Sequence, residues 1–170
     1  IIANLGLGDA INFLSVVDKY RAIYSKDNYE ITLVVSPGLK KLFENETGFD
    51  YIYSKNYNEI VFSLHKRIEF IKFLNEKKYD VLIDIMGPTG WSPSLYLIRC
   101  ANAKKKITLL NCANSFVPYN ILSKTYTDIY KINDNKISNV DYYNKLCNLI
   151  MKNTGKYEIL FHKTNNYPIN

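Results

Sequence analysis

The chain has 170 residues, a length that fits one domain with a substantial buried core and is short for a two-domain enzyme. Its residues are 47% hydrophobic with only 7 glycines and 5 prolines, which excludes collagen-like and disordered classes and leaves an ordinary globular protein. The formal net charge of +6 suits an anionic partner such as a phosphorylated glycolipid, but it also follows from a Lys-rich composition along the whole chain, and no basic cluster is dense enough to indicate a nucleic-acid surface.

Strands and helices alternate through the first part of the chain. The sequence predicts a buried strand at residues 1–4 and further strands at 31–35 and 51–53, with a short helix before Gly48 between the second and the third. Between the first two strands it predicts a helix over residues 10–24, with these residues on its apolar side: Ile11, Leu14, Val16 and Val17.

The alternation continues to the end of the chain. A long amphipathic helix is predicted over residues 58–78 from apolar residues at helical spacing, namely Ile60, Leu64, Ile68, Ile71 and Leu74. Strands follow at 81–85 and 107–110, and residues 126–132 form a strand or an extended segment. Helices are predicted at 92–100 and 140–152, with a little helix within the loop at 111–124 and a short strand or linker at 157–161. This order predicts an α/β fold with a Rossmann-like, doubly wound, mostly parallel sheet.

The sequence contains no pattern typical of a membrane span, a signal peptide, a disulfide framework or a metal site. No apolar run approaches the roughly 20 residues of a membrane-spanning helix, and no signal peptide is visible. Cys100, Cys112 and Cys147 form no C-x-x-C pair and have no histidine pair nearby, so they predict neither a disulfide framework nor a metal site and fit the cytoplasm. The chain begins without Met inside an apolar run, and we expect it to be a piece of a longer protein.

The stretch LGLGDAINFL joins the first strand to the first helix. Gly6 and Gly8 have the spacing that opens a dinucleotide-binding G-x-G-x-x-G turn, but Ile11 stands in place of the third glycine. Asp9 stands where the helix N-terminus would attract a phosphate, and an ionised carboxylate there repels a diphosphate. Asp9 is therefore a candidate general base for a hydroxyl group. The alternative is a helix N-cap with no chemistry.

A second glycine-rich turn, DIMGPTGWSPS, follows the strand at 81–85. Ligand crevices of parallel sheets lie outside the carboxyl ends of the strands, so its backbone N–H groups and the hydroxyls of Thr89 and Ser92 are candidates to face the same crevice as Asp9. The alternative is a tight strand-to-helix turn that one of these hydroxyls caps.

Three segments together resemble a known family: LGLGDAINFLSVVDKYRAIY, ITLVVSPG and YDVLIDIMGPTGWSPSLYLIRCANAKKKITL. They look like the N-terminal half of the family 9 glycosyltransferases, the bacterial lipopolysaccharide heptosyltransferases. The resemblance spans nearly the whole chain, and its specific motifs are the G-D turn and YDVLID. The chain departs from the family in its late helix, where Asn139, Tyr142 and Tyr143 replace a His and a Glu-Arg pair.

The resemblance implies a GT-B architecture of two Rossmann-like domains. Residues 1–157 would be the acceptor-binding domain, and residues 158–170 would start the linker to a C-terminal domain that binds the nucleotide-sugar donor. The implied reaction is an inverting, metal-independent transfer of a heptose-like sugar, from a donor such as ADP-heptose to a lipopolysaccharide-core or related glycan acceptor. The implied location is the cytoplasm, with peripheral association with the inner membrane, and the isolated domain is expected to be inactive.

Asp9 matches the aspartate proposed as the catalytic base of that family. Asn12 lies one helical turn later and either points into the same crevice or faces solvent. The residues expected to bind the acceptor are Gly8, Asn12, Gly87, Thr89 and Ser92, and no cofactor is expected beyond the donor. Two other classes stay open: a non-catalytic Rossmann-like binding module, and a nucleotide-dependent oxidoreductase, against which Ile11 and Asp9 count.

Overall fold

The computed structural model describes residues 1–88 and 93–154, and within them six parallel strands form one sheet. The strand order is β3-β2-β1-β4-β5-β6, which is the Rossmann order, with its switch point between β1 and β4. The predicted α/β sheet is confirmed. The strands are β1 (Ile2–Ala3), β2 (Thr32–Val35), β3 (Tyr51–Ser54), β4 (Val81–Asp84), β5 (Lys105–Asn111) and β6 (Asp128–Ile132).

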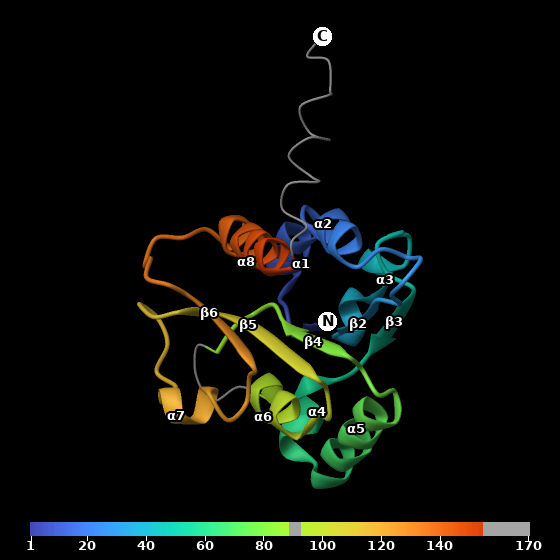
Figure 1. Cartoon of the computed structure of the whole chain (residues 1–170). Helices are drawn as coiled ribbons and strands as arrows, with labels where there is room; N and C mark the ends of the chain where they lie inside the picture. Colours follow the sequence, from blue (N-terminus) through green and yellow to red (C-terminus); the bar gives the residue numbers. More distant parts are fainter. Residues whose placement is uncertain (89–92, 155–170) are drawn as a thin grey trace.

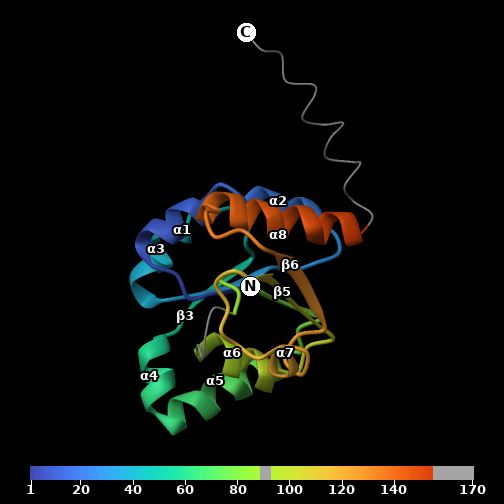
Figure 2. The same ribbon diagram turned by 90° about the vertical axis from the view of Figure 1, so that its left-hand side faces the viewer.

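Helices cover both faces of this sheet, as Figures 1 and 2 show. One layer, here the α1 layer, consists of α1 (Leu7–Leu14), α2 (Val17–Ile23), α3 (Lys40–Phe43) and α8 (Asn139–Asn153). The opposite layer, here the α5 layer, consists of α4 (Tyr57–Phe62), α5 (Leu64–Glu76), α6 (Pro93–Cys100) and α7 (Tyr119–Leu122). The sheet is thus doubly wound.

Alternate residues of each strand fill two separate hydrophobic cores. In β4, Leu82 packs toward the α5 layer and Ile83 toward the α1 layer, and Val34 and Val35 of β2 divide in the same way. This follows from the two-residue repeat of a strand. Because both faces are covered, β2 and β4 are nearly continuous apolar runs in the sequence, whereas the edge strands β3 and β6 are partly exposed. The positions predicted for the strands are confirmed to within a few residues.

The helix predicted over residues 10–24 is two helices, with the break at Ser15 and Val16. The Ser15 hydroxyl donates to the Asn12 carbonyl at 2.7 Å, and the Val16 N–H, which would bond that carbonyl in a continuous helix, bonds Phe13 O at 3.1 Å instead. A serine side chain thus competes with the backbone and ends α1. The predicted apolar side is also partly wrong, because Ile11 is 54% exposed while Phe13 is fully buried.

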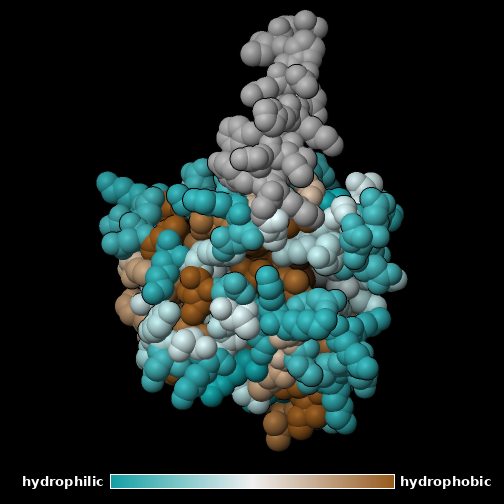
Figure 3. All heavy atoms as spheres, in the orientation of Figure 1, coloured by the Kyte–Doolittle hydropathy of each residue, from teal (hydrophilic) through white to brown (hydrophobic). Residues whose placement is uncertain are grey.

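The helix predicted over residues 58–78 also breaks, at Ser63, whose backbone is extended (φ −116°, ψ 113°). Ser63 accepts from the Lys66 N–H at 3.4 Å and so caps α5. Leu64 and Ile68 were predicted to face the core but are 64% and 45% exposed. Figure 3 shows the resulting hydrophobic surface at the lower end of the molecule, over α4 and α5.

The remaining predicted elements within the described residues agree with the structure to within one or two residues at most ends. The predicted strand or linker at 157–161 and the predicted interdomain linker at 158–170 lie outside the described residues, so the domain boundaries stay predictions.

Candidate active site

The turns after β1 and β4 emerge side by side at the switch point of the sheet, because Ile2 of β1 pairs in register with Asp84 of β4. Gly6 is the N-cap of α1, with extended backbone (φ −77°, ψ 170°), and no side chain caps this helix. The helix begins at Leu7, three residues before its predicted start, so Asp9 lies in its first turn. The interpretation of Asp9 as the N-cap is therefore wrong.

The Asp9 carboxylate instead accepts a hydrogen bond from a residue 130 positions later in the chain. Asn139, the first residue of α8, donates from Nδ2 to Asp9 Oδ1. The first turn of α8 is itself fixed, because Ser138 Oγ accepts from the Asp141 N–H at 3.1 Å. Asp9 is only half-buried, so a carboxylate that is oriented through one oxygen remains accessible from solvent.

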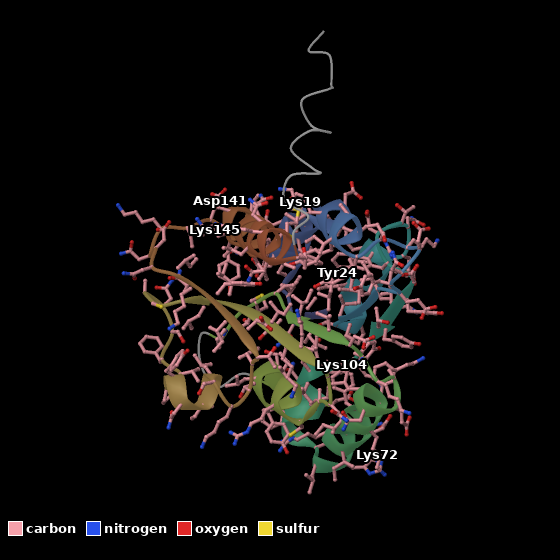
Figure 4. All side chains as sticks on the ribbon, in the orientation of Figure 1. Lys19, Tyr24, Lys72, Lys104, Asp141 and Lys145 are labelled. Atoms are coloured by element: carbon pink, nitrogen blue, oxygen red, sulfur yellow. The ribbon has the colours of Figure 1, made fainter. Side chains whose placement is uncertain are left out.

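Helix α8 is held in place over α1 and α2 by further contacts. Lys19 of α2 donates to Asn144 of α8 at 2.6 Å, and Figure 4 shows Lys19 beside α8. Tyr143 lies one turn after Asn139 and packs its ring edge-on against Phe13, with the ring centroids 5.7 Å apart. The position of Asn139 is therefore set by the packing of the whole α1 layer.

Tyr143 also connects α8 to the turn after β4, next to Asp9. Its hydroxyl donates to the Met86 sulfur at 3.8 Å. Burial, and to a smaller extent the nearby Asp9 charge, raise the pKa of Tyr143, which keeps this phenol neutral and a hydrogen-bond donor. Asp9, Asn139, Tyr143 and Met86 thus form one cluster from the β1 turn, the β4 turn and α8.

The β4 turn is anchored by Asp84, a fully buried carboxylate that the sequence analysis did not single out. It accepts from the Tyr126 hydroxyl at 2.6 Å and from the Met86 N–H at 3.3 Å. Burial raises its pKa from 3.8 to about 6, although the bonds from Tyr126, Met86 and Gly87 act in the other direction. In the sequence, Asp84 could have been noticed as the single charged residue at the end of the apolar strand VLID.

The predicted acceptor-binding residues near Asp9 are Gly8 and Asn12. Gly8 is exposed, and a Cβ added there would meet open space. Asn12 is half-buried one turn beyond Asp9. The structure thus places both beside the candidate base, and their contact with an acceptor stays a prediction.

Gly87 has a clear structural role. It is buried, has a φ of +67°, and a Cβ there would collide with the Tyr142 hydroxyl and the Leu109 carbonyl. Only glycine fits such a position without strain. Thr89 and Ser92 lie outside the described residues, so where their hydroxyls lie stays a prediction.

A cavity of about 290 Å³ lies at the opposite edge of the sheet, lined in part by Ile1, Thr32, Tyr51 and Val81 at the amino ends of the strands. It is therefore separate from the Asp9 cluster. Across residues 1–88 and 93–154, no group of three metal-ligating side chains is placed to hold an ion. No helix in the same residues is long and apolar enough to cross a membrane.

Comparison with solved structures connects this geometry to known enzymes. The Escherichia coli heptosyltransferase WaaC, solved with ADP, superposes with a TM-score of 0.65 at 18% identity, covering 88% of this chain and 45% of that one. The family 9 glycosyl transferase from Veillonella parvula DSM 2008 gives a TM-score of 0.62 at 17% identity, covering 91% and 40%. The chain has the fold of one domain of these glycosyltransferases.

The extent of the match fits the expected N-terminal domain of a two-domain GT-B enzyme, since the chain spans less than half of either solved protein. At 17–18% identity the similarity is one of fold. No protein-family model and no curated sequence matches the chain.

Proposed function

We propose that this chain is the acceptor-binding domain of an inverting glycosyltransferase that transfers a heptose-like sugar from a nucleotide-sugar to a lipopolysaccharide-core or related glycan acceptor. The observation that carries the proposal is the Asp9 carboxylate, which lies in the first turn of α1, directly after the turn that follows β1, and is oriented by Asn139. It occupies the ligand-binding edge of a sheet whose fold matches one domain of two solved glycosyltransferases.

In the proposed reaction the acceptor hydroxyl hydrogen-bonds to Asp9, which takes its proton as the oxygen attacks the anomeric carbon. A new carbon–oxygen bond forms as the bond to the leaving phosphate breaks, and the nucleoside diphosphate departs with the electron pair. Attack on the face opposite the leaving group inverts the anomeric centre. Asn139 keeps the carboxylate in one orientation, which raises the fraction of encounters that have productive geometry.

The donor site is proposed to lie in a second domain. WaaC was solved with ADP, and this chain spans 45% of its length. The N-terminus of α1, where a Rossmann fold would hold a diphosphate, carries the negative charge of Asp9. We therefore assign the acceptor to this domain and the nucleotide-sugar to its partner domain. The proposed reaction uses no metal or cofactor. The proposed location is the cytoplasmic face of the inner membrane.

The test is transfer by the full-length protein, supplied with ADP-heptose and a heptose-deficient lipopolysaccharide core. We expect Asp9→Asn to lower turnover by about 100-fold or more, because a general base typically contributes that much. The matched control is Asp18→Asn, which removes an exposed acid from the first turn of the next helix, and it should keep the wild-type rate. Thermal unfolding of both variants checks that the fold is intact.

The other outcomes separate the parts of the proposal. A wild-type rate in Asp9→Asn would leave glycosyl transfer standing and remove Asp9 as its base. Wild-type protein that is inactive with ADP-heptose but active with another nucleotide-sugar would correct the sugar. Inactivity with every nucleotide-sugar would favour the non-catalytic binding module.

A further inference from the structure

A hollow with a volume of about 290 Å³ lies between the ends of β2 and β3 and the helices α4 and α5. Its polar lining consists of these side chains: Ser54, Lys55, Asn56, Glu59, Lys66 and Glu69. Pro37 and the buried Ile60 add apolar surface. We call this cavity the β3 hollow. It shares no residue with the cluster around Asp9 and is therefore a separate feature of the surface.

The β3 hollow lies at the same edge of the sheet as Asp9. Ala3 of β1 pairs in register with Val35 of β2, and Val35 pairs with Ser54 of β3, so the three strands end in one row. At the usual strand spacing, the ends of β1 and β3 are roughly 10 Å apart. Figure 2 shows α1, which carries Asp9, and α4 on one side of the molecule, above and below the sheet. A ligand of more than one ring can extend from the hollow toward Asp9.

Packing and hydrogen bonds hold the polar groups of the hollow in place. The Lys55 ammonium lies over the rings of Phe70 and Phe73, 5.8 and 5.5 Å from their centroids. Asn56 caps α4 with its side-chain oxygen and donates from Nδ2 to Glu59 Oε1 at 3.0 Å. Groups that are already oriented lose little freedom when a ligand binds, which favours affinity.

The second carboxylate of the hollow is also oriented and charged. Glu69 pairs with Lys66 at 3.1 Å, and about half of each side chain stays exposed. The hydrogen bond from Lys66, its charge and the charge of Lys55 lower the pKa of Glu69, so this group is ionised at neutral pH. Its free lone pairs remain available to a donor from outside the protein.

The balance of charges indicates which kind of ligand fits. Two lysines and two glutamates line the hollow, so their formal charges cancel. A phosphate there would meet two carboxylates, and a cation would meet two ammonium groups. A hydroxyl both donates and accepts, so it can donate to a carboxylate and accept from a lysine or an amide. A neutral sugar, with several hydroxyls on one ring, matches this lining.

We propose that the β3 hollow binds one neutral sugar unit of a glycan, whose hydroxyls donate to Glu59 and Glu69 and accept from Lys55. The volume is at the lower end of the range for small-molecule sites, which fits one ring. The role of the site rests on the proposed function, because this sugar would belong to the acceptor whose reacting hydroxyl lies at Asp9. The acceptor is then a chain of sugars with an uncharged unit next to the reacting one.

The experiment measures binding of the full-length protein to immobilised oligosaccharides, without donor. The probes are short chains of neutral hexoses and heptoses in both anomeric forms, and each is also supplied with a phosphate on its terminal sugar. We expect saturable binding of at least one neutral probe. Its phosphorylated form should bind at least about fivefold more weakly, because Glu59 and Glu69 repel the added charge.

The variant Glu69→Ala tests the site, because it removes one acceptor and one negative charge. Affinity for the neutral probe should fall at least about 10-fold, since a hydrogen bond to a charged group is lost, and the preference over the phosphorylated form should shrink. The matched control is Glu44→Ala. Glu44 is also paired with a lysine, Lys40, and has a similar exposed fraction, but it lies at the end of α3 in the opposite layer and should bind like wild type.

The proposal is overturned if wild type binds no neutral probe, if it prefers the phosphorylated forms, or if Glu69→Ala binds as wild type does. Binding that depends on Glu69 in a protein that transfers no sugar would support the site and reject the proposed reaction. Normal sugar transfer by a protein that binds no neutral probe would support the reaction and overturn the site. The two failures are therefore distinguishable.

Discussion

Two carboxylates at the carboxyl edge of the sheet have opposite surroundings. Asp9 is half-buried at the start of a helix and bonded to an amide. Asp84 is fully buried beneath the β4 turn and bonded to a phenol and to the backbone. Because Asp9 can be reached from solvent, it is the better candidate to exchange a proton with a substrate. Because Asp84 is buried, its role is to hold the turn after β4 in place.

Burial of Asp84 makes the stability of the protein depend on pH. Its pKa rises from 3.8 to about 6 on folding, so between these values the folded state binds more protons than the unfolded state. The contribution of Asp84 to the free energy of unfolding therefore falls as pH rises from about 4 to about 6 and stays level above that range. A shift of this size corresponds to about 3 kcal/mol.

The variant Asp84→Asn should lack this dependence, because an amide does not titrate, so its free energy of unfolding relative to that of wild type should rise by about 2–3 kcal/mol from pH 4 to pH 7. Urea denaturation of both proteins from pH 4 to pH 7 measures the difference. Asp18→Asn, at an exposed position, should follow wild type throughout. A difference between Asp84→Asn and wild type that does not change with pH would show that folding does not raise the pKa of Asp84.

How far the site could be predicted from sequence differs between its residues. Asp9 stands in a local motif, and its place on the turn after the first strand followed from that motif. Its partner Asn139 is 130 residues away, and no local pattern connects the two. Asp84 was visible as a charge at the end of an apolar strand, but its bond to Tyr126 depends on how β4 and the segment before β6 pack.

At the scale of elements, the strands were predictable and the helix ends were not. Strands covered on both faces are apolar at every position, so their sequence signal does not depend on knowing which face is which. The helical spacing in residues 10–24 and 58–78 continues across Ser15 and Ser63, where the structure breaks. In both places a serine hydroxyl bonds to the local backbone, and this competes with the helix without disturbing the apolar pattern.

Helix α1 is held by Phe13, which contacts aromatic rings from three other elements and one loop. Its ring centroid lies 5.7–6.4 Å from those of Tyr20, Phe43, Phe49 and Tyr143. We expect Phe13→Ala to lower the free energy of unfolding by about 3–5 kcal/mol, because it leaves a cavity at a fully buried position. Chemical denaturation followed by circular dichroism measures this loss.

The control for Phe13 is on the same helix. Ile11 is 54% exposed, and Ile11→Ala should change the free energy of unfolding by no more than about 0.5 kcal/mol. Similar losses in the two variants would mean that α1 does not pack on Phe13 as the structure shows.

At the scale of the whole molecule, the chain forms one sheet with a hydrophobic core on each face and spans less than half of each solved glycosyltransferase. The proposed division of labour between this domain and a second, donor-binding domain predicts a difference in nucleotide binding. The 170-residue chain should show no saturable binding of ADP up to about 1 mM in titration calorimetry, whereas the full-length protein should bind it more tightly.

The variant Asp9→Asn of the 170-residue chain is the control for this prediction, because it tests whether the carboxylate is what keeps a diphosphate away from α1. If the unmodified chain binds ADP with micromolar affinity, the donor site lies in this domain, and a dinucleotide-binding function is favoured instead.

The hydrogen bond between Asp9 and Asn139 can form only late in synthesis, because the two residues are far apart in the chain. A ribosome that adds 5–20 residues per second needs roughly 7–26 seconds to travel the 130 residues between them. During that interval the segment that forms α1 has no α8 to cover Phe13. The geometry around Asp9 comes into existence only when α8 docks, so a partly synthesised chain has the acid but not the site.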